Sequence, residues 1–237
     1  MIKKRIINPI FQRLTIFWNF IQPNFLKNYF AAKYWSQHKE LYTPDRAPKI
    51  YELAKKKIKK INNILEFGSN SGCNLEYFLN RLEGSKVVGI DVNPIVKKME
   101  NQYESYRGYN ADDKALNKFK KNEFTLSFTS SVLDHIPDEK IVKEVLRKLA
   151  LISEYVILNE PFLDGVKGDV SEKFRYQVKQ NLENPAKKFA KYSYFWDYDS
   201  YLDEMNLNYE KINNPTHIFS MGPFYKLYFI DCRDYIE

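Results

Sequence analysis

Short apolar runs alternate with helix-like segments through the middle of the chain. Five runs have the length of buried strands, and they lie at 64–67, 87–90, 106–109, 124–128 and 155–158. Helical patterns precede the first run, follow Gly72 and Pro94, and cover 138–149. Alternating strands and helices predict an α/β fold whose sheet is parallel, with right-handed crossovers.

The carboxyl-terminal part departs from this alternation. Segments 207–212 and 225–230 read as two strands joined by a loop with proline and glycine. The preceding segment, 162–199, is longer than a simple connection and rich in aromatic residues. Ligands bind beyond the carboxyl ends of the strands in such folds, so we expect this insertion, with Tyr194 and Trp196, to contact a substrate.

The amino-terminal segment predicts two helices. Apolar residues between positions 6 and 21 recur on one helical face, and Pro23 ends that helix. Two interpretations are open: the face packs on the domain or in a homodimer, or it docks on lipid headgroups. A second helix, 24–37, is expected to form a lid. Its end and the following residues place several side chains toward a substrate, namely Tyr34, Trp35, His38, Tyr42 and Arg46.

Composition indicates one domain with additions. The 237 residues are 44% hydrophobic, and no linker divides them, so we expect an extension at 1–48 and a catalytic domain at 49–237. Two separated cysteines and three histidines offer no metal-ligand spacing, hence no expected metal site. We also find no signal peptide or membrane-length apolar stretch, which favours a cytoplasmic protein with reduced thiols.

The net charge of +7 suggests an anionic partner. A phosphorylated or nucleotide-linked small molecule, an anionic membrane surface and nucleic acid all fit that charge. No zinc ribbon, RNP-type sequence or appended basic domain supports nucleic acid specifically.

The strongest chemical signal is a turn with glycines after the first strand. Residues 64–72 read ILEFGSNSG, and the next strand, VVGID, ends on Asp91. The glycines allow a sharp turn with bare backbone against a ligand, and the acid after the second strand is placed to accept ribose hydroxyls. A nucleoside cofactor is therefore expected.

Motifs that are missing from the sequence narrow the choice of cofactor. A dinucleotide fingerprint needs glycines where Asn70 and Cys73 stand, and no P-loop occurs. What remains is a nucleoside with a short zwitterionic tail, which describes S-adenosylmethionine.

With the segments YNADD and FTLSFTSSVLDHIPD, the chain resembles the class I S-adenosylmethionine-dependent methyltransferases from about residue 58 to 162. The resemblance implies a Rossmann-like sheet of seven strands, mostly parallel, with an antiparallel last strand and helices on both faces. The sequence departs from the family at Asn70, usually glycine, and at Thr125, usually aspartate.

The same resemblance implies the cofactor contacts. The methionine moiety would lie on Glu66, Gly68, Asn70 and Gly72, with Ser69 beside them. Asp91 and the adjacent Val92 would meet the ribose, Asp112 the adenine amine, and Thr129 and Ser130 the region of the sulfonium. Local roles stay open: Asp112 often serves only a turn, and Thr129 and Ser130 are equally suited to cap a short helix.

Methyl transfer to oxygen usually needs a proton acceptor. His135, after the fourth strand of the sheet, and Glu160, after the fifth, lie where an acceptor could reach them. A capping role for His135, a base among Asp134, His38 and His217, and catalysis by proximity alone remain alternatives. The motif N-E-P-F at 159–162 resembles the N-P-P-[FY] signature of nucleic-acid methylases, but it follows the wrong strand and we reject it.

The sequence therefore predicts a methyltransferase that acts on oxygen, less favourably nitrogen, of a small polar or anionic acceptor such as a sugar, a nucleotide-sugar or a secondary metabolite. The alternatives are an RNA methyltransferase and a non-catalytic module that only binds the cofactor.

Overall fold

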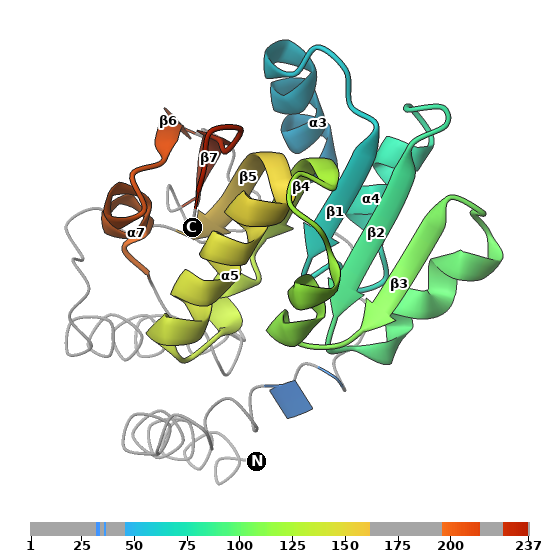
Figure 1. The fold of residues 1–237 in the computed structure, drawn as a ribbon. Helices are drawn as coiled ribbons and strands as arrows, with labels where there is room; N and C mark the ends of the chain where they lie inside the picture. Colours follow the sequence, from blue (N-terminus) through green and yellow to red (C-terminus); the bar gives the residue numbers. More distant parts are fainter. Residues whose placement is uncertain (1–31, 34–35, 37–45, 162–195, 214–224, 237) are drawn as a thin grey trace, which may run out of the picture.

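A computed structural model of the chain describes residues 32–33, 36, 46–161, 196–213 and 225–236 (Figure 1). The expected helix at 6–21, most of the lid and most of the insertion at 162–199 lie outside these residues. The predictions of membrane contact and dimerisation through the first helix therefore stay predictions.

The described elements follow the predicted alternation. The strands are β1 (Asn63–Phe67), β2 (Lys86–Asp91), β3 (Tyr106–Asn110), β4 (Phe124–Ser130), β5 (Ser153–Pro161), β6 (Asn208–Asn213) and β7 (Tyr225–Asp231). The helices are α3 (Arg46–Lys57), α4 (Cys73–Leu79), α5 (Glu139–Ile152) and α7 (Tyr198–Glu204), with 3-10 turns η1 (Pro94–Asn101), η2 (Asp113–Lys118) and η3 (Leu133–His135).

All seven of these strands join one sheet in the order β3-β2-β1-β4-β5-β7-β6. Strands β1 to β5 pair in parallel, whereas β7 is antiparallel to both β5 and β6. The predicted mostly parallel sheet with an antiparallel last strand is confirmed. Within the described residues, no helix has the length and apolarity that crossing a membrane requires.

Helices cover both faces of the sheet, as predicted (Figure 1). Alternate residues of a strand point to opposite faces, so Leu65 packs in the core beneath α5 and α7, while Ile64 packs in the core with α3 and α4. Both residues are fully buried. Burial on both faces explains why these strands read as continuous apolar runs.

The helical segment expected after Pro94 is the 3-10 helix η1, with Asn93 as its N-cap. Helix α3 begins at Arg46 and runs across residues 48 and 49. The division into an extension at 1–48 and a catalytic domain at 49–237 stays a prediction.

The carboxyl ends of the central strands meet at one edge. Phe67 at the end of β1 lies beside Ile90 and Thr129, and Ser130 lies beside Asn159. The turn after β1, the tip of β2 and the segment after β4 are thereby neighbours.

Candidate active site

The turn after β1 uses left-handed backbone at three residues. Gly68, Asn70 and Gly72 have φ of 79°, 47° and 83°. The backbone N–H groups of Gly68 and Ser69 both donate to the carbonyl of Ile90, at 2.8 and 3.1 Å. Gly72 then serves as the N-cap residue of α4. The turn is thus fixed to β2 at its start and to α4 at its end.

The glycines of this turn also make room for side chains from other elements. A Cβ on Gly68 would lie 2.2 Å from Cγ2 of Val132, and one on Gly72 would lie 2.3 Å from Sδ of Met99. The sequence predicted bare backbone for a ligand; the structure adds an internal packing requirement. Val132 follows β4, so its contact with Gly68 joins the β1 and β4 turns.

Asp91 holds the tip of β2 to this turn. One carboxylate oxygen accepts the backbone N–H of Asn70 and the other accepts that of Asn93, each at 2.7 Å. Burial raises the pKa of Asp91, and the two backbone N–H groups oppose that rise. Each oxygen keeps a lone pair, so a carboxylate fixed in this way fits the two hydroxyls of a ribose.

Glu66, near the end of β1, is buried next to the turn. Its Oε1 accepts the side-chain N–H of Asn74 at 2.7 Å, and its Oε2 has no hydrogen-bond partner among the described residues. Burial raises the pKa of Glu66 to about 8, against the lowering effect of the Asn74 hydrogen bond. An unpartnered buried oxygen at this place fits a ligand with a hydrogen-bond donor, such as the ammonium of a methionine moiety.

Three other expected cofactor residues have local partners, whereas the buried hydroxyls of Ser69 and Thr129 have no hydrogen-bond partner among the described residues. Asp112 accepts the N–H of Lys114 at 3.1 Å and caps η2, which is the turn role left open by the sequence. The carbonyl of Val92 accepts the side-chain N–H of Asn110 at 2.8 Å. The side chain of Thr129 is fully buried, and the hydroxyl of Ser130 accepts the side-chain N–H of Asn159 at 3.0 Å.

Two acids lie together at the ends of β4 and β5. Asp134 follows β4, whereas Glu160 is the second-last residue of β5 rather than lying after it as the sequence predicted, because β5 extends to Pro161. Both oxygens of the fully buried Glu160 accept the backbone N–H of Val132, at 3.2 Å. Burial and the charge of Asp134 raise the pKa of Glu160 to about 8. Burial likewise raises the pKa of Asp134, to about 7, although Arg46 lowers it. Two neighbouring buried carboxyl groups hold a proton to higher pH than either would alone.

Arg46 is the basic counterpart of these acids. Its guanidinium is buried and donates to the carbonyl of Ser130 at 3.2 Å. Its charge acts on Asp134 and also on Glu66. The sequence placed Arg46 near a substrate but did not predict that it connects the start of α3 to the end of β4, because no local pattern reports so distant a contact.

His135 ends η3 beside Asp134. Its Nδ1 lies 3.5 Å from Oδ2 of Asp134, and its side chain is mostly buried. The indole N–H of Trp196 donates to the carbonyl of Leu133 at 2.9 Å, so this expected substrate residue contacts η3. The remaining expected substrate residues lie outside the described part, as does His217; they are Tyr34, Trp35, His38, Tyr42 and Tyr194.

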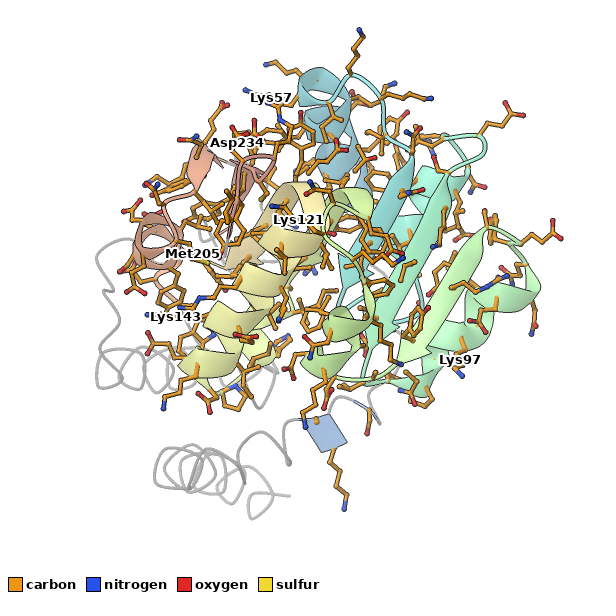
Figure 2. All side chains as sticks on the ribbon, in the orientation of Figure 1. Lys57, Lys97, Lys121, Lys143, Met205 and Asp234 are labelled. Atoms are coloured by element: carbon orange, nitrogen blue, oxygen red, sulfur yellow. The ribbon has the colours of Figure 1, made fainter. Side chains whose placement is uncertain are left out.

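Several lysines of the described residues lie apart from one another. Figure 2 shows Lys57, Lys97, Lys121 and Lys143 on separate elements around the outside of the domain. No group of three His, Cys, Asp or Glu side chains suited to a metal occurs among the residues that the structure describes.

Comparison with known proteins finds a family model that matches part of the chain. Residues 65–151 match the model of the family described as "Methyltransferase domain". No curated protein matches the sequence.

Several solved structures share the fold. An N1-methyltransferase for 1,6-didemethyltoxoflavin from Burkholderia thailandensis, with that compound and S-adenosylhomocysteine bound, is 14% identical, with a TM-score of 0.55 over 80% of this chain and 79% of that chain. An O-methyltransferase family protein from the same organism is 9% identical, with a TM-score of 0.52 over 78% of this chain and 57% of that one. The CurJ carbon methyltransferase is 12% identical, with a TM-score of 0.52 over 78% and 52%.

The present chain thus spans little more than half the length of the last two proteins, 57% and 52%. The three neighbours are named for transfer to nitrogen, oxygen and carbon, so the shared fold does not specify the target atom.

Proposed function

We propose that this chain, which carries a class I S-adenosylmethionine-dependent methyltransferase domain, transfers a methyl group from that cofactor to an oxygen of a small polar acceptor. The observation that carries the proposal is the attachment of Asp91 to the glycine turn through the N–H of Asn70, at 2.7 Å. It brings a ribose-binding carboxylate and a backbone turn together within one short site. When bound, the cofactor supplies an electrophilic methyl group on a sulfonium.

The order of strands supports an orientation of the cofactor along the edge of the sheet. Asp91 on β2 would hold the ribose. Glu66 on the neighbouring strand β1 and the turn after that strand, from Gly68 to Gly72, would hold the methionine moiety. The next strand is β4, so the methyl group would face Thr129, Ser130 and the residues after them. The acceptor would then lie over the ends of β4 and β5.

His135 is our proposed proton acceptor. A neutral imidazole suits removal of a hydroxyl proton near neutral pH, and the carboxylate of Asp134 beside Nδ1 would stabilise the imidazolium that forms. The proton then moves to Nε2 as the acceptor oxygen attacks the methyl group. Glu160 would act by fixing the turn at Val132 rather than by contact, because its side chain is fully buried and occupied by that N–H.

The proposal predicts turnover with methyl-labelled S-adenosylmethionine and a panel of sugars, nucleotide-sugars, phenols and hydroxy acids. His135→Asn should lower turnover of the best acceptor by roughly 10²–10⁴-fold and leave cofactor affinity unchanged. Binding of the cofactor without turnover of any acceptor would instead support the non-catalytic module.

RNA remains the second candidate because the chain has a net charge of +7. A polyanion would, however, have to approach an edge that carries Glu66, Asp91, Asp134 and Glu160. Filter binding to RNA whose affinity falls steeply with salt, together with methyl transfer to that RNA, would favour this candidate over a small acceptor.

A further inference from the structure

The edge that carries the site gathers buried acidic side chains. Although the net charge of the chain is +7, this edge holds the buried carboxyl groups of Glu66, Asp134 and Glu160. Arg46 is the only basic side chain that is buried among the described residues, and its charge acts on both Glu66 and Asp134. Because burial raises the pKa of each acid, these groups ionise near and above neutral pH, and once they are ionised one guanidinium faces three negative charges.

Two of the acids lie on one side of the edge. Asp134 follows β4 and Glu160 lies near the end of β5, on the side away from β2 and Asp91. Oδ1 of Asp134 has no hydrogen-bond partner among the described residues. The oxygens of Glu160 accept the N–H of Val132, a neutral donor that leaves the charge of the acid in place.

Both acids are buried, so their field passes through protein rather than water. Because protein screens charges less than water does, a buried charge acts on another charge several ångströms away more strongly than an exposed charge does. With the ribose on Asp91, the sulfur of the cofactor would lie between β1 and β4, within reach of this field.

We propose that Asp134 and Glu160 select the charged form of the cofactor, so that they favour S-adenosylmethionine, whose sulfonium is cationic, over S-adenosylhomocysteine, whose sulfur is neutral. This inference rests on the proposed function. The two acids act through their electric field, without touching the cofactor.

The selection has a consequence for turnover. During transfer the bond between sulfur and methyl breaks, its electron pair stays on sulfur, and the methyl carbon bonds to the acceptor oxygen, whose proton passes to His135. The sulfur thereby loses its positive charge, and the attraction to Asp134 and Glu160 ends with it. The field of the two acids thus weakens binding of the product relative to binding of the substrate and promotes cofactor exchange.

Calorimetry with three probes tests the inference without an acceptor. The probes are S-adenosylmethionine, S-adenosylhomocysteine and sinefungin, an analogue with an amine-bearing carbon in place of the sulfonium. At a pH above the pKa of Glu160, which is about 8, both acids are ionised. Under this condition Asp134→Asn and Glu160→Gln should each weaken binding of the two cationic probes by roughly tenfold and leave binding of S-adenosylhomocysteine unchanged.

Glu154→Gln is the matched control, because it removes the same charge from the opposite end of β5. It should leave all three affinities unchanged. A variant that merely disturbs the fold would weaken binding of all three probes alike. Equal losses of affinity for the three probes would therefore overturn charge selection. Unchanged affinities in both Asp134→Asn and Glu160→Gln would overturn it too. If the unmodified protein binds none of the probes, the proposed function itself fails.

Discussion

The carboxylate of Asp91 and the backbone N–H of Asn70 are joined by a hydrogen bond of 2.7 Å. The two residues follow neighbouring strands, β2 and β1. Their bond fixes the position of the acid relative to the glycine turn before any ligand arrives. Fixing the site in advance reduces the entropy that ligand binding must overcome.

Gly68→Ala is expected to destabilise the protein because two costs add. The backbone at Gly68 has φ of 79°, and the new Cβ would lie 2.2 Å from Cγ2 of Val132. The strain of positive φ costs about 1–2 kcal/mol, and overpacking adds about 1–3 kcal/mol. Denaturant unfolding followed by circular dichroism measures the sum.

Gly84→Ala separates the two costs. Gly84 has φ of 74°, but nothing lies within 4 Å of its Cβ position. The free energy of unfolding of Gly84→Ala should therefore fall only by the strain of positive φ, about 1–2 kcal/mol. Equal losses at positions 68 and 84 would contradict the proposed contact between Gly68 and Val132.

Arg46→Met should destabilise the fold although methionine has a similar length. The change removes the hydrogen bond to the carbonyl of Ser130 and leaves Asp134 and Glu66 without the buried charge that acts on them. Removing one partner from a buried charged group costs about 3–5 kcal/mol. Chemical unfolding at neutral pH should show this loss.

Lys56→Met on the same helix is the control for that experiment. Lys56 is exposed, so its replacement should change the free energy of unfolding by no more than about 0.5 kcal/mol. If Arg46→Met is as mild as this control, Arg46 does not hold the start of α3 to the end of β4.

Glu66 should make stability depend on pH. Its pKa in the folded protein is about 8, above the ordinary value of 4.5 that describes the unfolded chain. The folded state therefore holds the proton more tightly, so this stabilisation is complete below the unfolded pKa and is lost as pH rises through the folded pKa. Between these two values the wild-type protein should lose stability.

Glu66→Gln should remove that part of the dependence, because glutamine keeps an acceptor for Asn74 but cannot ionise. Its free energy of unfolding, relative to wild type, should rise by roughly 2–4 kcal/mol from mildly acidic to alkaline pH. Parallel curves for the two proteins would show that Glu66 titrates normally. Asp134 and Glu160 act in the same direction, so some slope should remain in the variant.

The sheet could be predicted from the sequence because each strand carries its own signal. Continuous apolar runs such as 64–67 mark strands that are buried on both faces, and Pro215, Gly222 and Pro223 mark the break before β7. The resemblance to the family predicted seven strands, mostly parallel, with an antiparallel last strand, and the sheet has this form; the order β3-β2-β1-β4-β5-β7-β6 was not predicted.

The contacts across the site could not be predicted in this way. Arg46 and Ser130 are far apart in the sequence, and no local sequence pattern at either residue predicts contact with the other. The same holds for Val132, because its packing on Gly68 depends on the conformation of the segment after β4. The sequence predicted a helix after Pro94 but not its 3-10 form, because the N-cap and proline signals at Asn93 and Pro94 suit either kind of helix.

Calorimetry of S-adenosylmethionine with the wild-type chain and Asp91→Ala tests the central claim most directly. We expect wild type to bind and the variant to lose about 1–3 kcal/mol of binding free energy, since charged hydrogen bonds to the ribose are removed. Asp112→Ala, which removes an exposed capping acid from the neighbouring loop, is the comparison, and it should lose less. Absence of binding to the folded wild-type protein, or an unchanged affinity in Asp91→Ala, would contradict the account.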